Sequence, residues 1–318
     1  MRDYALKRIK KGLITREYIV YIAFLAIFVF FSIVLSGRGF LSGGNLMNIA
    51  RQTAMISVMA VGMTFVLGAG EIDLSIGSIV ALASLTAALT LRHSSLLNGI
   101  LVGLGTGIGV GFVNGLFVAK IGVPSFLVTL GMTGIVTGVA RWITQLKSIP
   151  VTNDTYNFIF GSGDIGPISI LFIWTLALLI LGQVTLRKTK FGRYVLATGG
   201  NKTSALYSGI NVDRIKMLVM VQNGMLAALA GMLYAGRLHG ARYTLGETDL
   251  MTVIAAVIIG GTSLSGGRGS VIGSIVGSLI MGMINNGLIL MGLSVDQQMI
   301  FRGLIIIIAV SLTMREKK

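Results

Sequence analysis

Long apolar runs separated by short polar breaks make up most of this chain. A helix that crosses a membrane needs about 20 mostly apolar residues, because it rises about 1.5 Å per residue through about 30 Å of hydrocarbon. Runs of this kind lie near 18–36, 46–69, 73–91, 96–119, 124–143, 166–185, 214–236, 250–264, 269–290 and 297–313. The pattern predicts an all-α integral membrane protein, a polytopic bundle of about ten transmembrane helices.

Composition strengthens this prediction. Hydrophobic residues make up 54% of the chain and charged residues only 12%, too few to solvate a soluble protein of 318 residues. The chain has 44 glycines and 3 prolines. Small residues let membrane helices approach closely, so this content favours a tightly packed bundle. The absence of cysteine excludes disulfides and thiolate metal sites.

The net charge of +15 is explained by membrane orientation rather than by nucleic-acid binding. With a cytoplasmic N-terminus, 18 of the 26 basic residues fall on the cytoplasmic side, which favours two cytoplasmic termini. We therefore expect a basic cytoplasmic segment at 1–17, which contacts lipid, and one transmembrane domain at 18–318. The long polar stretch at about 186–213 then faces the cytoplasm.

Four segments carry a resemblance to a known family. They are FGRYVLATGGNKTSALYSGI at 191–210, GEIDLSIGSIVAL at 70–82, VNGLFVAKIGVPSFLVTLGMTGIVTG at 113–138 and VIAAVIIGGTSLSGGRGSVIGS at 253–274. Together they resemble the permease subunits of ATP-binding-cassette sugar importers, above all the ribose and autoinducer permeases. The resemblance covers nearly the whole chain in order. Glu71 departs from the pattern, because the family more often has glycine there.

The resemblance implies a set of partners and a place in the cell. It implies a homodimer or heterodimer of permeases in a bacterial inner membrane, joined to two cytoplasmic ATPase subunits and supplied by a periplasmic binding protein. The cargo would be a small sugar or a sugar-like signal. Permeases of the same superfamily for branched-chain amino acids or nucleosides remain an alternative.

The resemblance also implies that short helices in the 186–213 stretch dock on the ATPase. Apolar residues such as Leu206 would enter a groove, Arg193 and Lys202 would pair with acidic residues, and glycines would allow sharp turns. The alternative is an ordinary basic loop that only fixes orientation. The candidate coupling residues are Phe191, Gly192, Arg193, Ala197, Gly199, Gly200, Asn201, Ala205, Ser208, Gly209 and Ile210.

The chain itself is not expected to hold a cofactor or to catalyse a reaction. LSGG, which resembles a signature of cassette ATPases, occurs at 41–44 and 264–267, but no G-x-x-x-x-G-K-[ST] phosphate loop accompanies it. We expect ATP and Mg²⁺ on the partner ATPase. No nucleophile with a nearby base and no metal-binding cluster stands out.

Glu71 and Asp73 form the most conspicuous acidic pair. Carboxylates inside a membrane are costly and often relay protons or bind ions, so an ion-coupled secondary transporter is an alternative function. The preferred interpretation is that Asp73, assisted by Ser75, caps the helix that follows by accepting hydrogen bonds from its N–H groups.

Polar residues supply two further groups of candidates. Amide side chains in the apolar runs carry the donors and acceptors that sugar hydroxyls require, although each is more simply a link between helices. These translocation-path candidates are Asn114, Gln222, Asn223, Asn285 and Asn286. Charged residues in the outer loops can pair with the receptor, or are simply solvated. These docking candidates are Lys147, Arg237, Arg242, Glu247 and Asp249.

Overall fold

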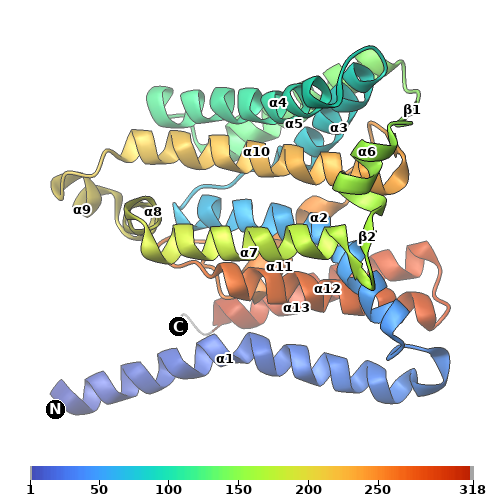
Figure 1. Cartoon of the computed structure of the whole chain (residues 1–318). Coiled ribbons are helices and arrows are strands. Elements are labelled where there is room, and N and C mark those ends of the chain that lie inside the picture. The colour runs from blue at the N-terminus through green and yellow to red at the C-terminus, as the bar shows by residue number, and fades with distance from the viewer. Residues whose placement is uncertain (1, 316–318) are drawn as a thin grey trace.

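Helices that run along the length of one bundle dominate the fold (Figure 1). The structure, a computed structural model, describes residues 2–315; residue 1 and residues 316–318 lie outside the described part. The long helices are α1 (Arg2–Val34), α2 (Gly43–Gly68), α3 (Ile76–Leu91), α4 (Leu96–Leu116), α5 (Ser125–Thr144), α7 (Ile170–Lys188), α10 (Val212–Leu238), α11 (Asp249–Ile259), α12 (Val271–Leu290) and α13 (Val295–Arg315).

Short elements join these helices at the two ends of the bundle. The helical ones are η1 (Ser36–Arg38), η2 (Phe117–Ile121), α6 (Asp154–Asn157), η3 (Phe158–Ser162), α8 (Lys190–Gly200) and α9 (Lys202–Tyr207). Strand β1 (Ile149–Pro150) pairs antiparallel with β4 (Gly240–Ala241), and β2 (Asp164–Ile165) pairs antiparallel with β3 (Ile168–Ser169). The predicted all-α class is therefore correct, apart from these two-residue strands.

Each predicted apolar run falls on one of the long helices. The largest difference at a C-terminus is in α11, which ends at Ile259 rather than at 264. Gly260 follows the helix and Gly261 has a φ of +89°, a left-handed conformation that ends a helix. At the N-terminal end of the chain, residues 2–17 were expected to be a separate basic segment. Their backbone instead forms the first half of α1.

Six helices among the described residues are long and apolar enough to cross a membrane: α2, α4 with η2, α5, α7, α10 and α12. Three shorter apolar helical segments accompany them, at Tyr18–Val34, Ile76–Leu91 and Asp249–Ile259. Outward-facing side chains of α4, α5 and α7 include Leu101, Leu130 and Leu181, each more than half exposed. The chain is therefore a multi-pass membrane protein whose outer helices present apolar surface to lipid.

Glycine permits a direct backbone contact between α4 and α10. Gly103, Gly107, Gly111 and Gly115 follow one another every four residues, so they lie on one face of α4. A Cβ atom added at Gly107 would collide with the backbone carbonyl of Gly224 on α10. The α4 and α10 backbones therefore touch directly, an approach that only small residues permit.

Helix α2 lies at the centre of the bundle, and most of its residues are buried. Two pairs of buried hydroxyl groups connect it to α12: Ser57 with Ser278, and Thr64 with Ser274, whose Oγ atoms are 2.7 Å apart. Helix α1 lies along the side of the bundle (Figure 1), and Phe31 of α1 and Leu35 directly after it pack into a smaller apolar cluster. Hydroxyl pairs satisfy each other inside the bundle, where no water is available to do so.

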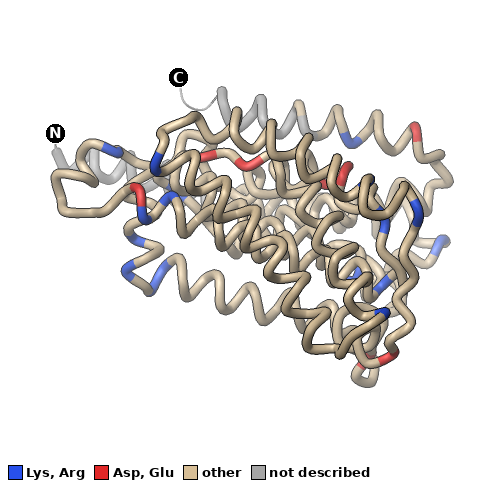
Figure 2. The backbone as a smooth tube through the Cα atoms, turned by 90° about the horizontal axis from the view of Figure 1, so that it is seen from above, with Lys and Arg blue, Asp and Glu red and all other residues tan. Residues whose placement is uncertain are grey.

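Helices α8 and α9 share one end of the bundle with the start of α1 and the end of α13 (Figure 1). The paired strands and α6 lie toward the opposite end. The Lys and Arg positions gather toward both ends, and the middle of the bundle carries few of them (Figure 2). This distribution is the one that a membrane imposes, since charge is costly at mid-depth.

The α4–α10 contact gives a direct test of the packing. Gly107→Val would force the two backbones apart and should lower the free energy of unfolding by about 1–3 kcal/mol, the usual cost of overpacking. Gly105→Val is the matched control, because a Cβ at Gly105 meets nothing within 4 Å. Thermal unfolding in detergent should show a clear loss for the first variant only. Equal stability of the two variants would contradict the packing described here.

Candidate functional site

The polar stretch predicted at 186–213 folds into two capped helices. The Thr189 hydroxyl accepts a hydrogen bond from the Gly192 N–H at 3.2 Å, which caps the start of α8. The Asn201 side chain accepts one from the Ser204 N–H at 2.9 Å and caps α9. Gly209, with a φ of +78°, then turns the chain toward α10. The local sequence thus contains the cap of each helix and the turn that follows them.

The coupling candidates divide between an inner and an outer face. Gly192 and Ala205 are buried, and Phe191, Gly199 and Ile210 are half-buried; these five pack against the chain's own core. The exposed candidates are Arg193, Ala197, Gly200, Asn201, Ser208 and Gly209. Two apolar side chains join this exposed face: Leu206 is 51% exposed and Tyr207 is 90% exposed.

The inner face of α8 touches the bundle through backbone atoms. A Cβ atom on Gly199 would collide with the Gly68 carbonyl at the end of α2 and would lie 2.8 Å from the Gly267 nitrogen. The Gly267 N–H in turn donates to the Gly68 carbonyl at 3.0 Å. Gly266 and Gly267 both have left-handed φ values, +79° and +76°. The second LSGG tetrapeptide therefore packs against α8 and joins it to α2.

Glu71 and Asp73 have separate partners. The Glu71 carboxylate forms an ion pair with Lys216 in the second turn of α10. Asp73 is fully buried, and its Oδ1 accepts hydrogen bonds from the Ser75 N–H at 2.8 Å and the Ser75 hydroxyl at 2.6 Å. Asp73 thus binds a single backbone N–H directly before α3, a smaller capping role than the sequence suggested. The two residues do not act as one acidic pair.

Two of the translocation-path candidates complete this buried cluster. Asn223 on α10 donates to Asp73 Oδ2 at 2.8 Å, and Asn114 on α4 donates to the Ser75 hydroxyl at 2.9 Å. Both asparagines are fully buried. Their amides therefore tie α4 and α10 to the break between α2 and α3, which is the interhelical role weighed above for amide side chains.

The other amide candidates differ from one another. Asn286 on α12 exchanges two hydrogen bonds with Asn45 at the start of α2, at 2.9 and 3.0 Å. Gln222 is half-buried. Asn285 faces a cavity and accepts a hydrogen bond from Arg302 at 3.0 Å.

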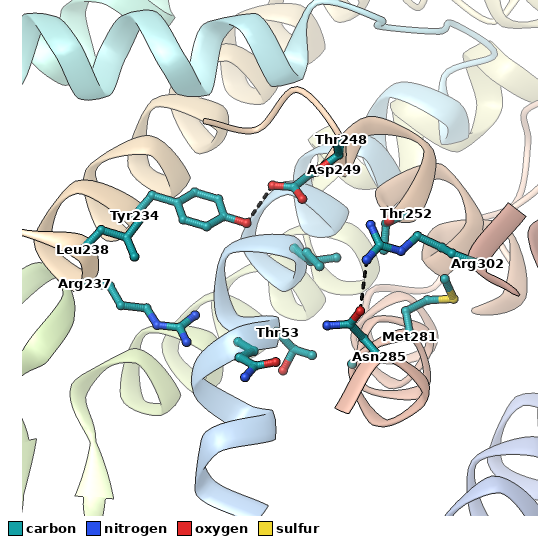
Figure 3. A pocket seen from close by; sticks show the side chains of 13 residues that line it. Thr53, Tyr234, Arg237, Leu238, Thr248, Asp249, Thr252, Met281, Asn285 and Arg302 are labelled. Atoms are coloured by element: carbon teal, nitrogen blue, oxygen red, sulfur yellow. Dashed lines mark hydrogen bonds between the residues drawn. The ribbon is translucent and has the colours of Figure 1, made fainter. Parts of the chain in front are cut away.

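This cavity, of about 330 Å³, is lined by residues of α2, α10, α11, α12 and α13 and by Thr248 before α11 (Figure 3). Its residues from α10 lie in the last two turns of that helix, at the end of the bundle opposite α8 and α9 (Figure 1). Tyr234 and Asp249 meet at its upper side, where the tyrosine hydroxyl donates to Asp249 Oδ2 at 2.7 Å. Arg237 and Arg302 reach toward the middle from opposite sides (Figure 3). The cavity therefore combines hydrogen-bond donors and acceptors in one partly enclosed space.

The receptor-docking candidates fall into an exposed group and a half-buried group. Lys147, Arg242 and Glu247 are exposed at the end of the bundle where the cavity lies. Arg237 and Asp249, which the sequence suggested as outer-loop residues, are half-buried and line the cavity with Asn285. The structure therefore brings together two docking candidates and one path candidate.

Sequence reasoning missed six polar residues of the cavity: Gln52, Thr53, Tyr234, Thr248, Thr252 and Arg302. Arg302 had a usable signal, because it lies within an apolar run, and an ionisable residue there is a candidate functional residue. Gln52 and Tyr234 had none, since their positions in the cavity depend on how α2 and α10 pack.

Comparison with known proteins adds to this geometry. Residues 45–310 match the family described as the permease component of a branched-chain amino acid transport system. The ribose import permease RbsC of Bacillus subtilis is 39% identical over 292 residues, which cover 91% of this chain and 91% of that protein. RbsC of Escherichia coli is 38% identical over 291 residues, 90% of this chain and 91% of that one.

A more distant relative extends the comparison along nearly the whole chain. The xylose transport system permease XylH of Haemophilus influenzae is 32% identical, and the alignment covers 97% of this chain and 98% of that protein. No solved structure matches. This chain therefore belongs to the family of transport-system permease components that contains these ribose and xylose permeases.

Proposed function

We propose that this chain is the membrane-spanning permease subunit of an ATP-binding-cassette importer for a small sugar. The observation that carries the proposal is 38–39% identity to ribose import permeases over nine tenths of the chain. The ATP is hydrolysed on separate cytoplasmic subunits, and a binding protein on the outer side delivers the sugar. A second permease, identical or related, completes the path.

The proposed topology has ten spans, both termini in the cytoplasm and the bundle in a bacterial inner membrane. Two observations support it. The termini of the described helices α1 and α13 share one end of the bundle with α8 and α9 (Figure 1). That end also carries a run of exposed cations, Arg187, Lys188, Lys190, Arg193, Lys202 and Arg214, as expected of a cytoplasmic surface.

Helices α8 and α9 are the proposed docking surface for the ATPase. The exposed Leu206 and Tyr207 side chains supply the apolar contact, and the surrounding cations suit an acidic partner. The backbone contact between Gly199, Gly68 and Gly267 gives a displacement of α8 a direct route into α2 and into the segment between α11 and α12. Alternating access requires two packings of the bundle, and such a displacement would change their relative populations.

An ion-coupled mechanism through Glu71 and Asp73 receives less support. Lys216 neutralises Glu71, and Asp73 accepts three hydrogen bonds from Ser75 and Asn223. A proton relay needs a carboxylate with access to water, and Asp73 does not line the cavity.

The proposed topology can be tested by labelling single introduced cysteines, because the chain has no cysteine of its own. Lys202→Cys on α9 and Glu247→Cys before α11 both introduce thiols at exposed positions at opposite ends of the bundle. A membrane-impermeant maleimide added to intact cells should label Glu247→Cys and reach Lys202→Cys only after permeabilisation. Labelling of Lys202→Cys in intact cells would overturn the proposed orientation.

The energy source is tested by reconstitution into vesicles. The chain alone should show neither ATP hydrolysis nor uphill uptake of D-ribose, and both should appear once the ATPase subunits and the binding protein are added. With ATP supplied, a protonophore should leave the initial uptake rate unchanged. Uphill uptake by the chain alone that a protonophore abolishes, and that Asp73→Asn removes in a folded protein, would establish the ion-coupled alternative instead.

A further inference from the structure

We propose that the cavity between α2, α10, α11, α12 and α13 is a binding site for one neutral, polyhydroxylated ligand on its way through the membrane. This inference rests on the proposed function and deepens it, because it assigns a substrate site within this chain. The site lies toward the outer end of the bundle, where a sugar released by a receptor would arrive.

The unused hydrogen-bonding groups of the cavity are the first argument. Tyr234 donates to Asp249 Oδ2, but among residues 18–305, whose side chains the structure describes, no hydrogen bond reaches Asp249 Oδ1. Asn285 Oδ1 accepts from Arg302, and within the same residues its Nδ2 group has no acceptor. The only hydrogen bond of Arg237 in this part of the chain is a long one, 3.4 Å, to the Arg51 carbonyl. Polar groups at least half-buried with spare capacity are those that a polar ligand can satisfy.

The orientation of these groups is the second argument. Tyr234 and Arg302, which also line the cavity, hold two of these groups in place: the Tyr234 hydroxyl donates to Asp249, and Arg302 donates to Asn285 (Figure 3). Each pair is 2.7–3.0 Å apart and half-buried, so the side chains are restrained before a ligand enters. A site that is ordered in advance loses less free energy when the ligand binds.

Charge selects the ligand class. Two guanidinium groups against one carboxylate disfavour a cation, and the carboxylate repels an anion from its side of the cavity. The α-ammonium of an amino acid would need several acceptors, whereas Arg237, Arg302 and Asn285 offer mainly donors. A sugar hydroxyl both donates and accepts, so it can donate a hydrogen bond to Asp249 and accept one from Asn285 or Arg237.

Size limits the ligand to a single ring. A volume of about 330 Å³ is at the small end of the 300–1,000 Å³ range of ligand sites. Ile56, Leu238 and Met281 add apolar wall for the C–H faces of a sugar. Because few groups converge on the ligand, binding should be weak, which suits a site that must also release its cargo.

The test uses the assembled transporter in vesicles, with its ATPase subunits, its binding protein and tritiated D-ribose. Asn285→Ala removes a donor from the cavity, and Asn98→Ala removes an exposed amide from the first turn of α4 as the matched control. We expect Asn285→Ala to reduce uptake about tenfold, the effect of about 1.4 kcal/mol of lost binding. Receptor-stimulated ATP hydrolysis should remain, and Asn98→Ala should transport normally.

A second variant distinguishes a binding defect from a loss of the folded structure. Asp249→Asn keeps an acceptor for the Tyr234 hydroxyl, so it preserves that contact while it exchanges the free carboxylate oxygen for an amide. Uptake should again fall about tenfold at unchanged ATP hydrolysis. Normal uptake by both variants would overturn the cavity site.

Failure of the inference and failure of the proposed function have different signatures. If wild-type transporter takes up no sugar with ATP, the proposed function fails. If it takes up D-ribose and both cavity variants do so equally well, only the cavity assignment fails. ATP-driven uptake of tritiated L-leucine in place of D-ribose, lost in Asp249→Asn, would assign the cavity to an amino acid and overturn the sugar site.

Discussion

Direct contact between backbones is the constraint on which the rest of this structure depends. In lipid, apolar side chains gain little from packing on other helices, so association relies on close fit and on hydrogen bonds between helices. Gly107 and Gly111 of α4 meet α10 at carbonyl groups, and Gly199 of α8 meets the backbones of Gly68 and Gly267. Because the backbones are in contact with no space between them, a shift of one helix must be accommodated by its neighbour.

That constraint connects the two functional regions of the chain. At one end, the exposed face of α8 and α9 carries Leu206, Tyr207 and a set of cations, which is the proposed docking surface for the ATPase, while their inner face contacts the end of α2. At the other end, α2 supplies Gln52 and Thr53 to the polar cavity. Most residues of α2 are buried, so this helix is a rigid connection between the α8 end of the bundle and the cavity.

The sequence predicted the helices well because apolar length is a local property. Each run fell on a helix, and the capping residues Thr189, Asn201 and Asn211 all precede the helices that they start. The sequence also predicted that the 186–213 stretch is a distinct surface, since its charge and glycine content differ from everything around it. It could not predict that Ala205 and Ile210 pack inward, because that depends on how α8 and α9 sit against the bundle.

The polar sites were harder to predict, because tertiary packing decides them. Glu71 and Asp73 are two residues apart, yet Lys216 and Asn223 of α10 hold them separately. Asn285 and Asn286 are neighbours, but a helix turns by about 100° per residue, so one lines the cavity and the other pairs with Asn45. Arg237 and Asp249 lie beside an outer loop in the sequence and line the cavity in the fold.

The most direct measurement of the central claim compares two adjacent glycines of α8 in the assembled transporter. A methyl group at Gly199 would collide with the Gly68 backbone, whereas at Gly200 it would meet Gly267 at an ordinary 3.7 Å. Sugar uptake per ATP hydrolysed should fall several-fold in Gly199→Ala while ATP hydrolysis continues, and Gly200→Ala, which adds a methyl group to the exposed face without a collision, should lower it much less. Unchanged uptake per ATP in Gly199→Ala would contradict the claim that force enters the bundle through this contact.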